Sequence, residues 1–211
     1  MRRARVFLAD DHSLLLEAFS TLIETDYEVV GTATDGRQML AEVRKLEPDV
    51  VVLDISMPNL NGFDAAVKLH KLLPDIKIIF LTVNDDPTMV SEALDIGANG
   101  YLLKKSSADQ LLEALNVVLN GGTYVTPQIE QDSGNDKTAA GAAAAGKPAL
   151  SVRQREVLQL LAEGKSMKQV AGILHITPRT VAFHKYQIME VLGIKTNSEL
   201  IQYAIKLGLV T

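Results

Sequence analysis

The sequence predicts two folding units: an α/β unit with a five-stranded parallel sheet covered by helices on both faces, and an all-α unit of four helices. Strand-like and helix-like segments alternate five times across residues 1–125, with a period of about 25 residues. A Gly- and Ala-rich stretch follows, and four short amphipathic segments then occupy residues 150–211. The chain of 211 residues is long enough for two domains of ordinary size.

Five short apolar runs bounded by turn residues predict the strands. They are residues 5–9, 28–33, 50–53, 76–81 and 101–103. Between and after them, apolar side chains recur at the spacing of one helix face, which predicts helices at residues 13–24, 37–46, 63–73, 87–96 and 108–119. This alternation favours parallel βαβ units, because neighbouring parallel strands need a crossover connection.

The third strand belongs to the most informative stretch of the chain, VVLDISMPNLNG from Val51 to Gly62. Its apolar residues run into a single carboxylate, Asp54, before a Met-Pro step stops any helix and an Asn-Gly pair supplies turn residues. A short run bounded by such breakers is typical of a strand buried on both faces. An acid at the end of this strand is a nucleophile, a metal ligand or a cap for the following loop.

Right-handed crossovers place the carboxyl ends of parallel strands on one edge of the sheet, where open α/β sheets bind their ligands. Four of the five predicted strands end beside a polar side chain. These residues are Asp10 with Asp11, Asp54, Thr82 and Lys104. Each has an ordinary structural explanation by itself, as a helix cap, a strand-end residue or a solvated charge. Their convergence on one edge predicts a functional site.

The residues at this edge suit phosphoryl chemistry. Three carboxylates without a metal would repel one another and raise one another's pKa, whereas a small hard dication such as Mg2+ removes that repulsion. The same ion would neutralise an incoming phosphoryl group, while Lys104 and Thr82 contact its oxygens. Asp54 is then suited to in-line attack on phosphorus, which gives an acyl phosphate.

Residues 126–149 change character, because Gly, Ala, Ser and Asn dominate and Ile129 is the only large apolar side chain. Such a segment buries too little surface to offset its ordering entropy. We therefore expect one domain at residues 1–125, a flexible linker at 126–149 and a second domain at 150–211.

Cap residues predict where each of the four helices in the last unit begins. They are Ser151 with Gln154, Ser166 with Gln169, Thr177 before Pro178, and Thr196 with Glu199. A tight turn at residues 174–176 separates the second and third helices, which predicts a helix-turn-helix bundle. The third helix, residues 177–191, is the one expected in a DNA major groove, with Val181 and Ile188 facing the core.

Charge is unevenly distributed along the chain. Residues 1–125 hold 11 basic and 19 acidic residues, a net charge of −8, whereas residues 150–211 hold 8 basic and 4 acidic residues, a net charge of +4. A polyanion is therefore expected to bind the C-terminal unit. The absence of cysteine excludes disulfides and thiolate metal sites. With no long apolar run and no signal-peptide pattern, we expect a cytoplasmic protein.

Motifs in both units resemble a known family. ADDH at residues 9–12, LDISMPNLNG at 53–62, Thr82, and GANGYLLKK at 97–105 resemble the receiver domain of two-component response regulators, which has a flavodoxin-like fold. The segment LSVRQREVLQLLAEGKSMKQVAGILHITPRTVAFH, from Leu150, resembles a LuxR-type helix-turn-helix. The pairing resembles the NarL/FixJ subfamily.

The resemblance implies a transcription factor controlled by phosphorylation, not an enzyme, with a sensor histidine kinase as phosphoryl donor. It also implies that the phosphorylated form dimerises and binds promoter DNA. By position, Asp54 is similar to the phospho-acceptor. Asp10, Asp11, Asp54 and the backbone carbonyl of Ser56 are similar to the Mg2+ ligands. Thr82 and Tyr101 match the switch pair that rearranges around the phosphoryl group, and Lys104 matches the lysine that contacts phosphate.

In the second unit the expected DNA contacts lie near the start of the third helix and around it. They are Lys165, Lys168, Thr177, Arg179, Thr180, Phe183, His184, Lys185 and Lys195. Any one of these lysines is equally well explained as a solvated surface charge. Phe183 and Tyr186 either touch thymine methyl groups or pack, and we expect packing for one of them. The last helix is the family's usual contact between DNA-bound copies, here Glu199, Gln202, Tyr203 and Lys206.

Some positions depart from the family pattern. Ala182 and Val191 stand where recognition helices often carry a basic residue, which predicts fewer phosphate contacts and a shallow salt dependence. Val83 follows the switch threonine where small residues are frequent, and we expect its bulk to slow phosphotransfer, hydrolysis or both. Gly172 is expected to weaken the second helix locally.

Two alternatives remain open at the level of sequence. An aspartyl phosphatase or phosphotransferase needs a second carboxylate shortly after Asp54, where Ser56 offers only a hydroxyl, and it leaves the last four helices unexplained. A receiver that acts as an interaction module without phosphorylation has the same architecture, although the intact acidic edge argues against it.

Overall fold

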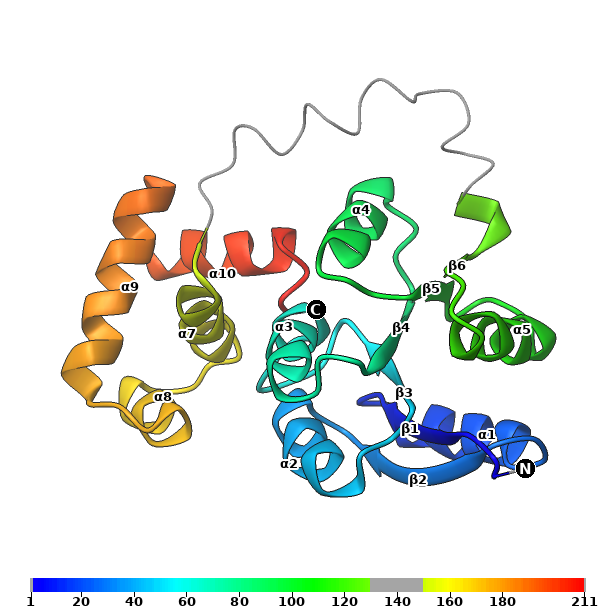
Figure 1. Cartoon of the computed structure of the whole chain (residues 1–211). Helices are drawn as coiled ribbons and strands as arrows, with labels where there is room; N and C mark the ends of the chain where they lie inside the picture. Colours follow the sequence, from blue (N-terminus) through cyan, green and yellow to red (C-terminus); the bar gives the residue numbers. More distant parts are fainter. Residues whose placement is uncertain (1, 130–149, 211) are drawn as a thin grey trace.

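A computed structural model describes residues 2–129 and 150–210 of the chain (Figure 1). Residues 130–149, which make up most of the predicted flexible linker, lie outside the described residues. Within the described ranges, no helix combines the length and the apolar character that crossing a bilayer requires.

The first unit is built on one parallel sheet with the strand order β2-β1-β3-β4-β5-β6. The strands are β1 (Arg5–Ala9), β2 (Glu28–Ala33), β3 (Val50–Asp54), β4 (Lys77–Thr82), β5 (Gly100–Leu103) and β6 (Tyr124–Val125). We predicted five strands, and the sheet has six. The additional strand β6 pairs with β5. Because β6 is only two residues long, it is too short to produce a recognisable apolar pattern in the sequence.

Five helices cover the two faces of this sheet, as predicted. They are α1 (Ser13–Ile23), α2 (Gly36–Leu46), α3 (Gly62–Leu72), α4 (Pro87–Asp95) and α5 (Ala108–Leu119). The core on one face takes its helical side chains from α2, α3 and α4, and the core on the other face takes them from α1 and α5. Strand β3 is buried along its whole length, because both faces of the sheet are covered (Figure 1).

The first unit extends past the predicted boundary at residue 125. Thr126 is fully buried, and its hydroxyl accepts a hydrogen bond of 3.0 Å from the Leu103 N–H. Ile129 is 3% exposed and belongs to the core beneath α3 and α4. The expected linker start at residue 126 was therefore too early, because one apolar side chain in a polar stretch is enough to fasten the segment to an existing core.

The second unit holds four helices, α7 (Val152–Ala162), α8 (Met167–Leu174), α9 (Pro178–Leu192) and α10 (Asn197–Lys206). All four predicted caps are present, and those of α7, α8 and α10 are complete capping boxes. The turn between α8 and α9 passes through His175, which has φ 52°. Val181 and Ile188 are fully buried, as expected. Helix α7 lies against α3 of the first unit, whereas α9 lies on the side away from it (Figure 1).

Candidate functional site

The carboxyl edge of the sheet brings together the predicted acidic and basic residues. Asp54 ends β3 and Asp10 follows β1, and each is only 2% exposed. The Lys104 ammonium, which follows β5, lies 2.7 Å from Asp10 Oδ2 and 3.0 Å from Asp54 Oδ2. The strand register aligns these ends, because Ala9 pairs with Leu53 and Asp54 pairs with Leu81. One cation, with a side chain 10% exposed, therefore bridges two buried carboxylates.

Electrostatics at this edge work in opposite directions on Asp54. Burial raises the pKa of its carboxyl group, and the neighbouring Asp10 raises it further, whereas the Lys104 ammonium and the Ser56 N–H lower it. Burial lowers the pKa of Lys104, but its contacts with the Asp10 and Asp54 carboxylates outweigh this effect and raise it. The lysine is therefore held in its charged form between the two acids.

Asp11 lies beside this pair at the surface, and the structure adds His12, which sequence reasoning missed. The His12 Nδ1 atom lies 2.7 Å from Asp11 Oδ1 and 3.1 Å from Asp10 Oδ1. The ligand atoms of these three residues lie within 4.8 Å of one another. Carboxylate oxygens suit Mg2+, whereas an imidazole nitrogen suits softer metals. The two acids therefore suit a hard divalent cation, whereas His12 is suited to hydrogen bonding with these acids. Its position directly after the two acids was the signal in the sequence.

Thr82 and Tyr101 are both linked to the loop after β4. The Asn84 N–H donates a hydrogen bond of 3.2 Å to Thr82 Oγ1, and the Tyr101 hydroxyl donates one of 2.9 Å to the Asn84 carbonyl. Tyr101 is fully buried, and burial raises the pKa of its hydroxyl far above the usual range. Asn84 thus contacts both Thr82 and Tyr101.

In the second unit, α9 presents most of the side chains expected to contact DNA. Arg179, Thr177 and Phe183 are exposed, and His184 and Lys185 are half-buried. Thr177 is also the N-cap and accepts the Thr180 N–H at 3.1 Å. We expected one of Phe183 and Tyr186 to pack inside, and this was wrong, because they are 57% and 66% exposed. Exposed aromatic side chains on a helix surface are typical of a contact with a partner.

The three lysines outside α9 differ in how free they are. Lys168 and Lys195 are exposed. The Lys165 ammonium lies 2.8 Å from Glu163 Oε2, so part of its charge is already balanced within the chain. A paired lysine releases fewer counterions when it meets a phosphate.

Comparison with known proteins decides the family. Residues 6–116 match the model of the response regulator receiver domain, and residues 148–204 match that of the bacterial regulatory proteins of the luxR family. The oxygen regulatory protein NreC of Staphylococcus carnosus (strain TM300) is 36% identical over 210 residues, covering 96% of this chain and 97% of that protein. The transcriptional regulatory protein DegU of Brevibacillus brevis is 32% identical, covering 98% and 94%. The chain belongs to the response regulators with a LuxR-type DNA-binding domain.

Solved structures agree with this assignment. The RcsB response regulator of Salmonella typhimurium matches with a TM-score of 0.67 at 26% identity, covering 98% of this chain and 99% of that one. RcsB from Salmonella enterica serovar Typhimurium, bound to promoter P1flhDC in the presence of the phosphomimetic BeF3-, matches with a TM-score of 0.63 at 28% identity. The family regulates transcription and is not a family of enzymes, which removes the phosphatase alternative.

Helix α10 of this response regulator carries the residues expected to join two DNA-bound copies. Gln202 and Lys206 are exposed, and Tyr203 is half-buried. The Glu199 carboxylate accepts the N–H groups of Lys195 and Thr196 at 2.7 and 2.8 Å, and these bonds lower its pKa. Glu199 therefore serves first as a cap of α10. The apolar spacing of this helix also predicted Ile201 and Ile205 on its buried side, and this was wrong, because they expose 39% and 51% of their surface.

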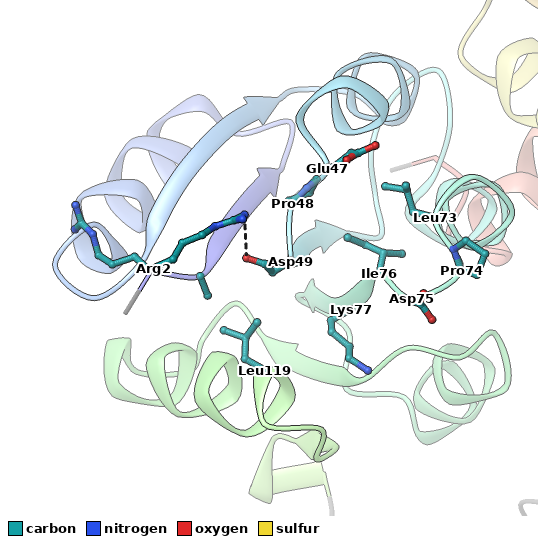
Figure 2. Close-up of a pocket in the computed structure, with 12 residues that line it drawn as sticks. Arg2, Glu47, Pro48, Asp49, Leu73, Pro74, Asp75, Ile76, Lys77 and Leu119 are labelled. Atoms are coloured by element: carbon teal, nitrogen blue, oxygen red, sulfur yellow. Dashed lines mark ion pairs between the residues drawn. The ribbon is translucent and has the colours of Figure 1, made fainter.

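The receiver also has a broad open pocket on the opposite edge of the sheet, at the amino ends of the strands (Figure 2). Its lining mixes Arg2 and Lys77 with the acidic Asp49 and Asp75, and Arg2 and Asp49 form an ion pair of 4.0 Å. Because the charges of the lining largely balance and the pocket lies across the sheet from Asp54, it has no part in the predicted chemistry.

Proposed function

We propose that this response regulator is switched by phosphorylation of Asp54 and that the phosphorylated form binds promoter DNA as a homodimer. The observation that carries the proposal is the Lys104 ammonium held between the buried carboxylates of Asp54 and Asp10, in a chain that also has a LuxR-type domain. A largely desolvated cation beside a buried nucleophile is suited to a third, anionic group that arrives at the same edge.

Phosphotransfer then follows from the residues at the edge. A carboxylate oxygen of Asp54 attacks the phosphorus of a phosphohistidine on a sensor histidine kinase, and the bond from phosphorus to the histidine nitrogen breaks. The product is an acyl phosphate on Asp54, and the electron pair of the broken bond stays with the imidazole. The Lys104 ammonium moves from its carboxylate partner to a phosphoryl oxygen, and so replaces one ion pair by another.

We propose that Asp10, Asp11, Asp54 and the carbonyl of Ser56 hold Mg2+ at this edge. The support is a donor set of hard oxygens, in which Asp10 is almost fully buried and Asp11 is open to solvent. When bound, Mg2+ supplies positive charge to the phosphoryl oxygens during transfer.

The signal would leave the edge through Thr82 and Tyr101. A phosphoryl oxygen on Asp54 would accept a hydrogen bond from the Thr82 hydroxyl, whose oxygen now accepts the Asn84 N–H, and a movement of this hydroxyl toward Asp54 would pull on Asn84. Because the Tyr101 hydroxyl is bonded to the carbonyl of the same Asn84, the loop after β4 and the tyrosine move together. This would bias the surface beside β4 and β5 between two states.

We place α9 in the major groove, with the exposed Arg179 and Phe183 toward the bases and Lys168 and Lys195 toward phosphates. Two copies would meet through α10 and bind half-sites about one helical turn apart. We further propose a receiver that ends after Ile129, a DNA-binding domain at residues 150–211, and a cytoplasmic location.

The test is the intact mass of the full-length protein after incubation with Mg2+ and acetyl phosphate. Wild type should gain one phosphoryl group and elute as a dimer on a sizing column, and Asp54→Asn should do neither. Asp85→Asn is the matched control, because Asp85 is an exposed acid paired with Lys105, and it should behave as wild type. A phosphoryl group on Asp54→Asn, or none on wild type, would show that the acceptor is wrongly assigned.

A further inference from the structure

Helix α7 is buried around its whole circumference. Glu156, Val157, Leu158, Gln159 and Leu160 are five consecutive residues that are each at most 1% exposed. Successive residues of an α-helix turn by about 100°, so five in a row reach every side of it. The three apolar residues belong to the core of the DNA-binding domain. The polar ones, Glu156 and Gln159, continue to Glu163 along the opposite stripe, which faces the receiver.

Gln159 bonds to the backbone of the loop that follows Asp54. Its Nε2 donates a hydrogen bond of 2.8 Å to the Met57 carbonyl, and its Oε1 accepts one of 2.9 Å from the Asn61 N–H. Between these two residues, the Asn59 N–H donates a hydrogen bond of 2.9 Å to Glu163 Oε1. Three backbone groups of this loop, residues 55–61, are therefore satisfied by side chains of the other domain.

Two reciprocal ion pairs flank this contact. Glu156 of α7 accepts Arg37 of α2 at 2.8 Å, and Arg155 of α7 lies 2.7 Å from Asp64 of α3. Lys68 of α3 adds a third contact to Glu156, at 3.3 Å. Each domain thus buries one carboxylate that contacts a cation of the other, and Glu156 also pairs with Arg153 of its own helix at 3.1 Å. A buried carboxylate that loses its partner is strongly unfavourable, so the charges fix one register of docking.

The bonded loop leads directly to the phosphorylation edge. A Cβ atom placed on Gly62, just after the loop, would lie 2.3 Å from the Asp54 carbonyl oxygen. The side chains of Met57 and Leu60 are buried in the receiver core, but the Met57 carbonyl and the Asn61 N–H depend on Gln159. The Ser56–Met57 peptide, which carries the proposed Mg2+ ligand, lies between the fixed Asp54 and this bond.

The docking does not cover the DNA-binding surface. Helix α9 lies on the side of its domain away from the receiver, with Phe183 and Tyr186 exposed (Figure 1). The docking buries four polar side chains, Asn61, Asp64, Glu156 and Gln159, and leaves the DNA-binding helix open. We therefore look for its role in the receiver.

We propose that Gln159 of the DNA-binding domain is a positioning residue for the chemistry at Asp54. By holding the Met57 carbonyl and the Asn61 N–H, it orders the loop that carries Ser56 and so strengthens Mg2+ binding and phosphotransfer. An ordered loop pays less entropy when it binds a ligand than a loop that must first be ordered. Coupling is reciprocal, so Mg2+ in turn strengthens docking of α7. This inference rests on the proposed function of Asp54.

The experiment compares full-length wild type with Gln159→Ala, using Mg2+ alone as the first probe. Titration calorimetry should show Mg2+ binding weakened about fivefold or more in the variant, the lower end of usual coupling between sites. Hydrogen exchange of the Asn59 and Asn61 amides should be faster. With acetyl phosphate, phosphorylation should slow at low Mg2+ and recover in excess Mg2+, which a general loss of structure would not produce. Gln128→Ala, which changes an exposed glutamine of the receiver, is the matched control.

A second variant loosens the same contact from the receiver side. Lys68→Ala removes an ion pair with Glu156, at a side chain that is 34% exposed, and leaves Gln159 intact. It should weaken Mg2+ binding in the same direction, and it provides the measurement if Gln159→Ala does not fold. Unchanged or tighter Mg2+ binding in the variants, with faster amide exchange, overturns the inference. If wild type takes up no phosphoryl group, the proposed function fails, and the Mg2+ comparison alone then decides the positioning role.

Discussion

Gly62 is expected to be irreplaceable, because the first turn of α3 touches the backbone of Asp54. An alanine Cβ at this position would lie 2.3 Å from the Asp54 carbonyl oxygen and 2.8 Å from the Ile55 Cα. Ordinary carbon contacts are about 3.5–4.0 Å, so the helix or the strand must move by about 1 Å. Both obstacles are backbone atoms, one in the last residue of the fully buried β3 and the other in the buried residue after it, and backbone cannot turn aside as a side chain would.

The consequences for stability and for chemistry are both calculable. Overpacking of this kind costs about 1–3 kcal/mol, and occasionally more. A displacement of about 1 Å at a reacting group costs on the order of 100-fold in rate. Gly62→Ala should therefore lower the free energy of unfolding by about 1–3 kcal/mol and reduce phosphorylation of Asp54 far more than this loss of stability explains. Urea unfolding followed by circular dichroism and intact-mass phosphorylation kinetics measure the two effects.

Gly172→Ala is the matched control, because the substitution is the same and the surroundings differ. Gly172 lies in α8, with nothing within 4 Å of its would-be Cβ. Replacing a helical glycine by alanine should stabilise the protein by about 1 kcal/mol and leave phosphorylation unchanged. If Gly62→Ala unfolds within about 0.5 kcal/mol of wild type and is phosphorylated at the wild-type rate, the close approach to Asp54 is not rigid and the reasoning fails.

Three further predictions concern the receiver edge around Asp54 and the exposed face of α9. Lys104→Met removes the only cation that lies between the two buried carboxylates in the described part of the receiver edge. Repulsion between these carboxylates should then raise the pKa of Asp54 further, and phosphorylation should fall at least about tenfold. The control variant Lys105→Met, at an exposed ion pair, should change phosphorylation little. Val83→Ala, at a side chain 74% exposed beside Thr82, should speed phosphotransfer or hydrolysis in the same mass assay, and unchanged rates for both would contradict a gating role. Ala182→Lys on α9 should steepen the slope of log binding constant against log salt by about 0.9 in a fluorescence titration with duplex DNA, and an unchanged slope would place residue 182 away from phosphate.

Local chemistry in the sequence was sufficient for the elements and for the edge. The apolar run before Asp54 predicted a strand buried on both faces, because a short run bounded by breakers has few other stable positions. The caps of α7 to α10 were predicted correctly, because a cap is a bond between residues three apart and needs no tertiary context. The meeting of Asp10, Asp54 and Lys104 followed from the rule that parallel strands end on the same edge.

Contacts between residues far apart in the sequence were decided by tertiary structure alone. Strand β6 exists because an edge of β5 was free to pair, and Ile129 is buried because a core was there to receive it. Glu156 and Gln159 show this most clearly. On their own helix they have the pattern of a solvated polar face, and they are buried only because the receiver presents Arg37 and the loop after Asp54. The sequence thus determined which groups each domain carries, whereas the docking of two folded surfaces determined which of those groups meet, because complementarity between such surfaces leaves no periodic trace in either segment.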